Sequence, residues 1–266
     1  MSDRTYRFSY KPRGNSSNDE QRWNVPDNLY ESLDCDKTQR LAFGDFEVED
    51  EPFGFRLKNP AHKNTFWIST KDRNLVLSDK YLEVGFEIYS QQLFGWGERT
   101  RDYMLDEGEY SIWPTGISKE VDDGKKGYNT YGDHPFILAR LKDKTYLGLF
   151  FKNSNAKVME YKHESKGRSV VNLKTVGGIL DVFAFMGDTA EEVLKQYHKV
   201  IGKPFLPPRW AFGYHQGSSG YTDVDTAKES IKEFNDADIP LEALWLDESF
   251  QRDYRLFDVD QENFTN

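Results

Sequence analysis

Cysteine is almost absent from this sequence of 266 residues, since Cys35 is the only one. A single thiol cannot form an internal disulfide, so cysteine usage leaves the redox compartment undecided. Apolar runs long enough to cross a membrane are also missing, and the basic first residues lead into no apolar stretch of the kind that signal peptides contain. We therefore expect no membrane interaction, and the localisation stays unknown.

Positively charged residues are also fewer than negatively charged ones. Lys and Arg number 35 against 45 Asp and Glu, which gives a net charge of -10, and no basic stripe is present. This balance argues against nucleic acid as a partner, because a phosphate backbone requires clustered cations. His, Cys and carboxylates show no metal-ligand spacing, so we expect no metal and no cofactor. The GWGE segment at 95–98 is too short for a phosphate loop and predicts a tight β-turn.

Aromatic residues are what the sequence has in excess. They make up 15% of the chain, with 6 Trp, 15 Tyr and 19 Phe. Such rings pack the interior of β-sandwiches, and they also stack on sugar faces, although packing is the commoner use. A hydrophobic fraction of 37% and a mean hydropathy of -0.78 indicate a soluble globular protein.

Short alternating segments dominate residues 41–187 and predict an antiparallel β-sandwich domain. They are rich in aromatic and β-branched residues and are separated by Gly, Asn and Asp. The clearest examples span 41–50, 80–89, 134–141, 145–153 and 178–187. The polar residues 1–40 predict an irregular N-terminal segment.

A connecting helix and a proline linker are predicted over residues 188–208. Thr189 is placed to cap the helix, Glu192 follows three residues later, and Gly202 ends it. One face is apolar and consists of Val193, Tyr197, Val200 and Ile201. The next segment, KPFLPPRW, contains three prolines that exclude both a helix and a central strand.

Residues 209–266 predict one βαβ unit. RWAFGYH and LEALWLD have the composition of buried strands, and TDVDTAKESIKEFNDAD between them has apolar residues at helical spacing. The two strands are expected to be parallel, with a right-handed crossover. A lone βαβ unit cannot bury both faces of its sheet, so we expect an incomplete barrel or sheet and a chain that is a fragment.

Four segments resemble glycoside hydrolase family 31 and occur in the family's order, over roughly residues 75–266. The stretch from 177 to 216 resembles the junction between the family's N-terminal β-sandwich and its barrel. LFGWGERT at 93–100 and YNTYGDHPFILA at 128–139 resemble two segments of the sandwich. IPLEALWLDESFQRDYRLFDVDQENF at 239–264 resembles the block after the second barrel strand.

The resemblance implies a galactose mutarotase-like β-sandwich followed by the truncated start of a (β/α)8 TIM barrel. It also implies a retaining α-glycosidase, most often an α-glucosidase, with an oligosaccharide or α-glucoside as substrate. Two Asp residues perform the chemistry in the family, and their carboxyl groups lie about 5 to 5.5 Å apart in retaining enzymes. Both belong to later barrel strands, so we predict no catalytic residue in this chain. Family members mostly enter the secretory pathway, while protein partners are left unknown.

Substrate-binding candidates follow from where the barrel strands end, because barrel sites lie at the C-terminal ends of strands. Asp247 ends the second strand and either binds sugar hydroxyls or orients its loop. Ser249 stands where the family carries a second Asp that binds sugar, and Glu248 is a possible substitute. In the first loop, Ser218 and Ser219 replace a polar or basic residue and an aromatic one.

Two further candidates are less directly placed. His215 lies in the first barrel strand and is either a satisfied core residue or faces the pocket. In the sandwich, the family offers an Asp to the sugar from a long loop. Glu120 is nearest that position, with Asp122 and Asp123 as competitors.

Two functions compete at this point. One is part of a family 31 glycosidase, inactive by itself, and the other is a non-catalytic carbohydrate-binding or scaffold protein with the same fold. The βαβ unit favours the first. The serines at 218, 219 and 249 favour the second, or indicate an altered specificity or a larger first subsite.

Overall fold

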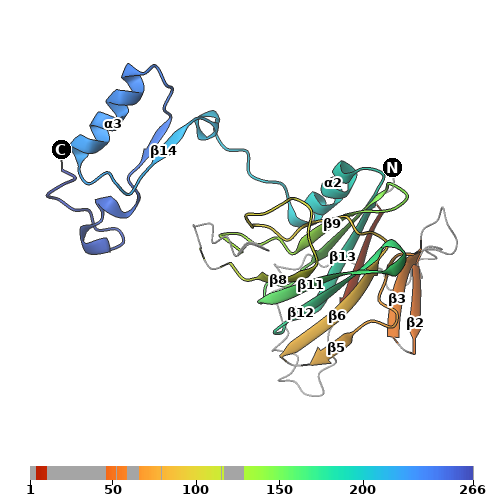
Figure 1. Ribbon diagram of the computed structural model, residues 1–266. Helices are drawn as coiled ribbons and strands as arrows, with labels where there is room; N and C mark the ends of the chain where they lie inside the picture. Colours follow the sequence, from red (N-terminus) through yellow and green to blue (C-terminus); the bar gives the residue numbers. More distant parts are fainter. Residues whose placement is uncertain are drawn as a thin grey trace. The chain divides into compact units, whose positions relative to one another are not determined.

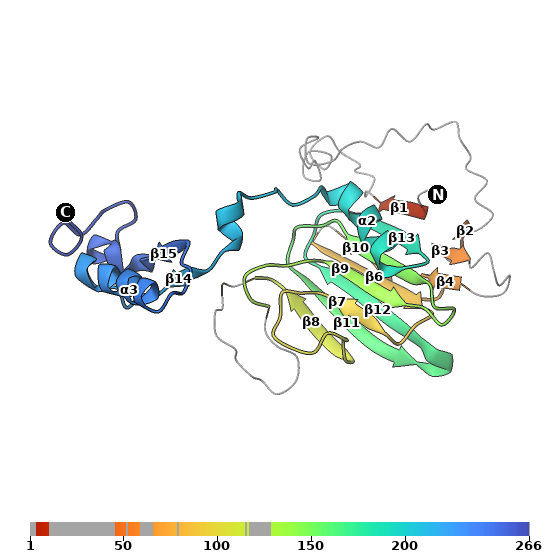
Figure 2. The same ribbon diagram turned by 90° about the horizontal axis from the view of Figure 1, so that it is seen from above.

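The structure is a computed structural model that describes residues 4–10, 46–51, 53–58, 66–78, 80–114, 116 and 129–265. The chain divides into two compact units, Met1–Gly202 and Lys203–Asn266. Figures 1 and 2 show that strands make up most of the first unit, whereas the second contains helix α3 and short strands.

The first unit contains two antiparallel sheets. The five-stranded sheet has the order β1 (Arg4–Tyr10), β13 (Leu180–Gly187), β10 (Tyr146–Phe151), β9 (Phe136–Arg140) and β7 (Leu93–Gly95). The eight-stranded sheet has the order β2 (Phe46–Asp50), β3 (Phe53–Lys58), β4 (Phe66–Ser69), β6 (Tyr81–Ile88), β12 (Arg168–Thr175), β11 (Lys157–Glu164) and β8 (Gly108–Ile112). The remaining strand, β5 (Leu75–Ser78), pairs with β6, and the turn η2 (Ser165–Gly167) joins β11 to β12.

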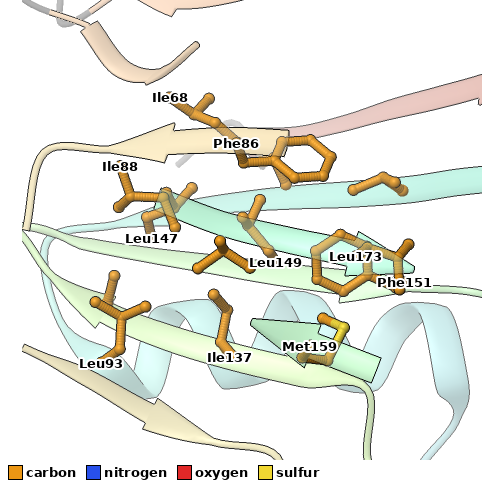
Figure 3. Close-up of a cluster of buried hydrophobic side chains, with 14 of the residues drawn as sticks. Ile68, Phe86, Ile88, Leu93, Ile137, Leu147, Leu149, Phe151, Met159 and Leu173 are labelled. Atoms are coloured by element: carbon orange, nitrogen blue, oxygen red, sulfur yellow. The ribbon is translucent and has the colours of Figure 1, made fainter. Parts of the chain in front are cut away.

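One buried cluster joins the two sheets, because alternate residues of each strand point to the same side. In Figure 3, Phe86 and Met159 from the larger sheet lie with Ile137 and Leu149 from the smaller one. The alternation of apolar and polar residues in the sequence therefore corresponds to alternation between the core and the surface of the domain. The prediction of a mainly antiparallel β domain is confirmed, and its likeness to galactose mutarotase stays a prediction.

Strand β13 is buried along its whole length because both faces of it are covered. One face joins the inter-sheet cluster, while Phe183 and Phe185 pack under helix α2 (Ala190–Ile201) against Val193 and Tyr197. The helix begins and ends as the sequence predicts, but Ile201, expected on its apolar face, is exposed. It is the last helical residue, so no further turn follows to cover it.

Strand β1 contradicts the irregular segment predicted at the start of the chain. Its backbone pairs with β13 from Arg4 opposite Met186 to Tyr10 opposite Leu180. The Arg7 guanidinium donates two hydrogen bonds, of 2.9 and 2.8 Å, to the buried carboxylate of Asp181. Local sequence does not reveal this strand, because its partner residues lie 170 to 182 positions away in the sequence. Residues 11–40 lie outside the described residues.

The second unit contains η3 (Arg209–Phe212), β14 (His215–Gly217), α3 (Val224–Asp236), β15 (Ala243–Trp245), η4 (Asp247–Phe250) and η5 (Arg252–Tyr254). Strands β14 and β15 are parallel, as predicted. The prediction that both strands are buried is wrong, since each has three residues and one neighbouring strand, and Trp245 is exposed. The 209–212 part of the first predicted strand is a 3-10 turn instead. The barrel itself stays a prediction.

In the part of the chain that the structure describes, no helix has the length and apolar character needed to cross a membrane.

Candidate functional site

The loops that follow β14 and β15 lie side by side, because parallel strands end at the same edge of their sheet. Gly217 is paired with Trp245, and the Ser218 amide donates to the Trp245 carbonyl at 3.4 Å. Within the first loop, the Ser218 hydroxyl accepts a 2.9 Å hydrogen bond from the Gly220 amide. Of the predicted site residues, Asp247 and Ser249 follow the end of β15 at this edge, whereas His215 is the first residue of β14.

His215 lies between two tryptophan rings. Its ring stacks on Trp210 at 5.7 Å between centroids and on Trp245 at 5.9 Å. The Trp245 indole N–H donates to His215 Nδ1 at 3.1 Å, which leaves Nε2 as the protonated nitrogen, facing the Trp210 carbonyl at 3.4 Å. Both ring nitrogens of His215 thus face protein groups, as in a histidine that is satisfied within the fold.

Ser249 ties the two loops together. Its hydroxyl donates a 2.6 Å hydrogen bond to the carbonyl oxygen of Ser219. A carboxylate at this position would bring a second acceptor toward that carbonyl, and two acceptors cannot bond without a proton between them. Two of the serines that depart from the family pattern are therefore direct partners, which the sequence did not indicate.

Asp247 stands apart from this contact. It opens the turn η4 with φ of 56°, a left-handed conformation that Asp tolerates better than most residues. Its side chain is exposed and has no hydrogen bond or ion pair within the described residues. An open hollow of about 640 Å³ lies beside it and is lined by Leu244, Trp245, Leu246, Asp247, Glu248, Phe250, Gln251 and Leu256. The hollow includes Asp247 and Glu248 but neither Ser249 nor His215.

Glu120 lies outside the described residues, together with Asp122 and Asp123. Its role as a sugar ligand therefore stays a prediction. The described residues at the start and end of this loop are Trp113, Pro114 and Gly116 on one side and Asn129 on the other.

Residues 93–100 and 129–139 contact each other in the first unit. The Glu98 amide donates to the Gly132 carbonyl at 3.2 Å, and the His134 amide donates to the Gly97 carbonyl at 2.9 Å. The Glu98 carboxylate accepts a 2.7 Å hydrogen bond from the Gly132 amide, which lowers the pKa of that carboxyl group. The tight β-turn predicted for GWGE is wrong, because its backbone forms hydrogen bonds with residues 130–136 instead of within itself.

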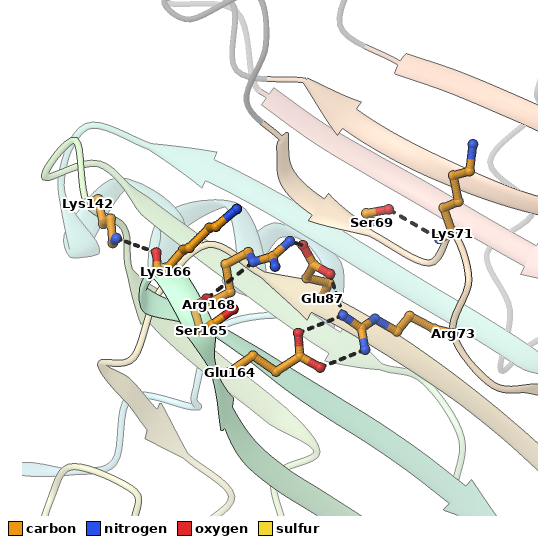
Figure 4. Close-up of polar contacts among 9 residues, drawn as sticks. All are labelled: Ser69, Lys71, Arg73, Glu87, Lys142, Glu164, Ser165, Lys166 and Arg168. Atoms are coloured by element: carbon orange, nitrogen blue, oxygen red, sulfur yellow. Dashed lines mark hydrogen bonds and ion pairs between the residues drawn. The ribbon is translucent and has the colours of Figure 1, made fainter.

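Ion-pair networks also occur on the larger sheet. In Figure 4, the Arg73 guanidinium makes two 2.8 Å hydrogen bonds to the carboxylate of Glu164, and Glu87 links Arg73 to Arg168. Acidic partners thus neutralise these two guanidinium groups, which suits a structural role. Over the described residues, no three His, Cys, Asp or Glu side chains gather in a way that would hold a metal ion.

Comparisons with known proteins agree with the resemblance. Residues 204–266 match the family model of the glycosyl hydrolases family 31 TIM-barrel domain. An alpha-glucosidase of Hordeum vulgare is 31% identical over 222 residues, covering 82% of this chain and 24% of the barley protein. A probable alpha/beta-glucosidase of Neosartorya fischeri is 29% identical over 254 residues, covering 92% of this chain and 28% of the fungal protein. The chain spans about a quarter of the length of these relatives.

Solved structures show the same fold. A glucosidase II alpha subunit with alpha3-Glc2 bound has a TM-score of 0.72 at 17% identity, over 83% of this chain and 29% of that chain. A family 31 dextranase of Flavobacterium johnsoniae in complex with isomaltotriose has a TM-score of 0.68 at 21% identity, over 80% of this chain and 25% of that chain. The resemblance to glycoside hydrolase family 31 is therefore confirmed.

Proposed function

Given this relationship to glycoside hydrolase family 31, we propose that the chain forms part of a retaining α-glycosidase that hydrolyses terminal α-linked glucose in oligosaccharides. The observation that carries the proposal is that relatives named as an alpha-glucosidase and a probable alpha/beta-glucosidase align with 82% and 92% of the chain, across both of its units. The parallel pairing of β14 with β15 adds support, because it has the order that starts a barrel.

The role of this part of the enzyme is to bind and position the sugar. Asp247 presents an unpaired carboxylate at the C-terminal edge of the parallel strands, where barrel enzymes bind their substrates. A charged acceptor forms shorter and stronger hydrogen bonds to hydroxyl groups than a neutral acceptor does. His215 and Trp245 would support the loop from beneath rather than react.

Residues 1–266 alone are expected to be inactive. A retaining mechanism needs a nucleophile and an acid/base carboxyl about 5 to 5.5 Å apart, and the family carries both on later strands. The test compares the chain with a longer product that continues its reading frame, using an aryl α-glucoside. The longer product should release the α-anomer first, as seen by NMR, and residues 1–266 should release nothing. Retaining hydrolysis by residues 1–266 would show that the catalytic pair is misplaced.

A second candidate is a carbohydrate-binding or scaffold protein without hydrolytic activity. The Ser249 hydrogen bond to Ser219 favours it, because that hydroxyl is used between loops and provides no charge for the sugar. Saturable binding of maltotriose by the longer product, with no release of glucose, would select this candidate over the enzyme.

A further inference from the structure

Two hydrogen bonds join the loop after β14 to the segment after β15, one on either side of Asp247. The Ser218 amide donates to the Trp245 carbonyl at 3.4 Å, two residues before Asp247. The Ser249 hydroxyl donates to the Ser219 carbonyl at 2.6 Å, two residues after it. We call these two bonds the serine clasp. Because they involve neighbouring residues of the first loop, the clasp fixes both ends of the segment that carries Asp247.

Asp247 has a backbone conformation that needs such support. Its φ of 56° lies in the left-handed region, which is costly for a residue with a side chain and persists where the surrounding structure imposes it. Its side chain is exposed and belongs to the wall of the hollow beside η4. The described residues that line this hollow include no Lys, Arg or His. The carboxylate can therefore accept hydrogen bonds from a ligand, provided that the backbone keeps this conformation.

Ser249 itself is unsuited to bind a sugar in the hollow. It is half-buried and is absent from the hollow's wall, to which its neighbours Glu248 and Phe250 belong. A serine hydroxyl has one hydrogen, and that of Ser249 is used in the bond to the Ser219 carbonyl. This bond holds the turn η4 against the first loop. A loop that is held in advance loses less conformational entropy when a ligand binds.

We infer that Ser249 is a positioning residue for sugar binding, which keeps the Asp247 carboxylate beside the hollow through the serine clasp and makes no contact with the sugar. The inference rests on the proposed function in one respect, namely that a sugar binds at Asp247. A carboxylate could not take the role of Ser249, because it has no hydrogen to donate to the Ser219 carbonyl. Ser249→Asp should therefore weaken sugar binding. A serine that contacts the sugar would instead gain a stronger acceptor from the same change.

The test uses the longer product that continues the reading frame and measures KM and kcat with an aryl α-glucoside. Ser249→Ala and Ser249→Asp both remove the hydroxyl donor, so each should lower kcat/KM about three- to tenfold, the range expected for one net hydrogen bond. Ser249→Thr keeps a hydroxyl and should stay within about twofold of the unchanged protein. Thr265→Ala is the matched control and should stay there too, because it removes another hydroxyl that donates to a carbonyl in this unit, that of Gln261 at 2.9 Å.

A double-mutant cycle shows whether Ser249 acts through Asp247. Asp247→Asn keeps the shape of the side chain and removes the charged acceptor. In that background, Ser249→Ala should lower kcat/KM by less than about twofold further, because the acceptor that it positions is already weakened. Strictly additive losses would overturn the inference. A rise in kcat/KM for Ser249→Asp would overturn it as well, since residue 249 would then contact the sugar itself.

Hydrolysis and binding separate this inference from the proposed function. If the longer product hydrolyses its substrate and Ser249→Ala has the kcat/KM of the unchanged protein, the inference is overturned and the proposed function stands. If the longer product hydrolyses nothing, the enzyme function fails. The same variants are then compared by the dissociation constant of maltotriose in isothermal titration calorimetry, where Ser249→Ala and Ser249→Asp should bind more weakly than Ser249→Thr. A longer product that neither hydrolyses nor binds these sugars would overturn both.

Discussion

Glu160, in the middle of β11, is surrounded by groups that stabilise its negative charge. Lys162 and Lys174 form ion pairs with it, and Asn172 donates a 3.2 Å hydrogen bond. The contact with Lys162, followed by the bonds from Asn172 and Lys174, lowers the pKa of Glu160 to about 2. The folded state therefore binds a proton at this carboxyl group more weakly than the unfolded state does.

The pH dependence of stability follows from that difference. A carboxyl group with a lowered pKa stabilises the fold above its unfolded pKa, about 4.3, and loses this contribution as the pH falls through about 2. We expect Glu160→Gln to lower the free energy of unfolding by about 1 kcal/mol at pH 7. The difference from the unchanged chain should shrink between pH 4.5 and pH 2, as measured by urea unfolding at each pH.

Glu109 provides the matched control for this prediction. It lies opposite Glu160 on β8 and is far more exposed, and its one ion pair among the described residues is with Lys174 at 3.7 Å. Glu109→Gln should change stability by less than about 0.5 kcal/mol. Equal losses of unfolding free energy for the two variants would contradict a stabilising role for the Glu160 charge. A loss for Glu160→Gln that is the same at pH 2 and pH 7 would contradict it as well.

Asp181 is the second residue whose charge matters to the fold. Its carboxylate is fully buried and accepts two hydrogen bonds from the Arg7 guanidinium, which fixes β1 on β13. Asp181→Asn keeps the shape but replaces the charged acceptor of both Arg7 hydrogen bonds with a neutral amide, so we expect a loss of about 2 to 3 kcal/mol. Hydrogen exchange should show faster exchange in residues 4–10 than in β6, and uniform change across all strands would argue against a local role.

At the scale of the element, helix α2 lies close to the sheet because Gly148 has no side chain. A Cβ atom at this position in β10 would lie 2.6 Å from Val193 Cγ1 and 3.0 Å from the ring of Phe136. Gly148→Ala should therefore push the helix outward and lower the free energy of unfolding by about 1 to 3 kcal/mol. Thermal unfolding followed by circular dichroism measures this loss.

A double variant tests whether the contact with Val193 is the cause. Val193→Ala alone leaves a cavity under the helix, because Val193 is fully buried. In combination with Gly148→Ala, it makes room for the new methyl group, so the double variant should be more stable than the sum of the two losses predicts. Strict additivity would mean that the strain arises elsewhere.

The elements show which structure can be predicted from local sequence. The sequence predicts helix α2 and its cap, because Thr189 and Glu192 lie three residues apart at its start. In the structure, the Glu192 amide donates a 3.2 Å hydrogen bond to the Thr189 hydroxyl, as expected for this cap. Strands β6 and β13 were predicted because apolar residues recur in them. The sequence does not predict strand β1. This segment is a strand because it pairs with β13, which lies near the other end of the unit's sequence.

At the candidate site, local sequence predicts even less of the structure. Asp247 and Ser249 follow the end of β15, as the sequence predicts, whereas His215 is the first residue of β14. The sequence did not indicate that Ser249 bonds to the Ser219 carbonyl or that His215 stacks between Trp210 and Trp245. These contacts depend on loop conformation, and the left-handed backbone at Asp247 has no signature in the residues around it.

At the scale of the whole molecule, the two units differ sharply in how much apolar surface they bury. The first unit shares its core among two sheets and a helix. In the second unit, Tyr221 and Ala227 are the buried apolar residues among 203–265, while Phe212, Trp245 and Phe257 are exposed. A two-stranded sheet with one helix is marginally stable by itself, so the second unit should open far more often than the first.

Limited proteolysis measures this difference directly. Chymotrypsin cleaves after large apolar residues, and Phe212 and Trp245 are exposed in the second unit. Residues beyond Phe212 should be lost first, whereas a product that keeps residues 129–202, with β9 to β13 and α2, should persist. Mass spectrometry identifies the products. A stable product that keeps residues 209–266 while β9 to β13 are digested would mean that the second unit has a core that these contacts do not reveal, and the burial argument would then be wrong.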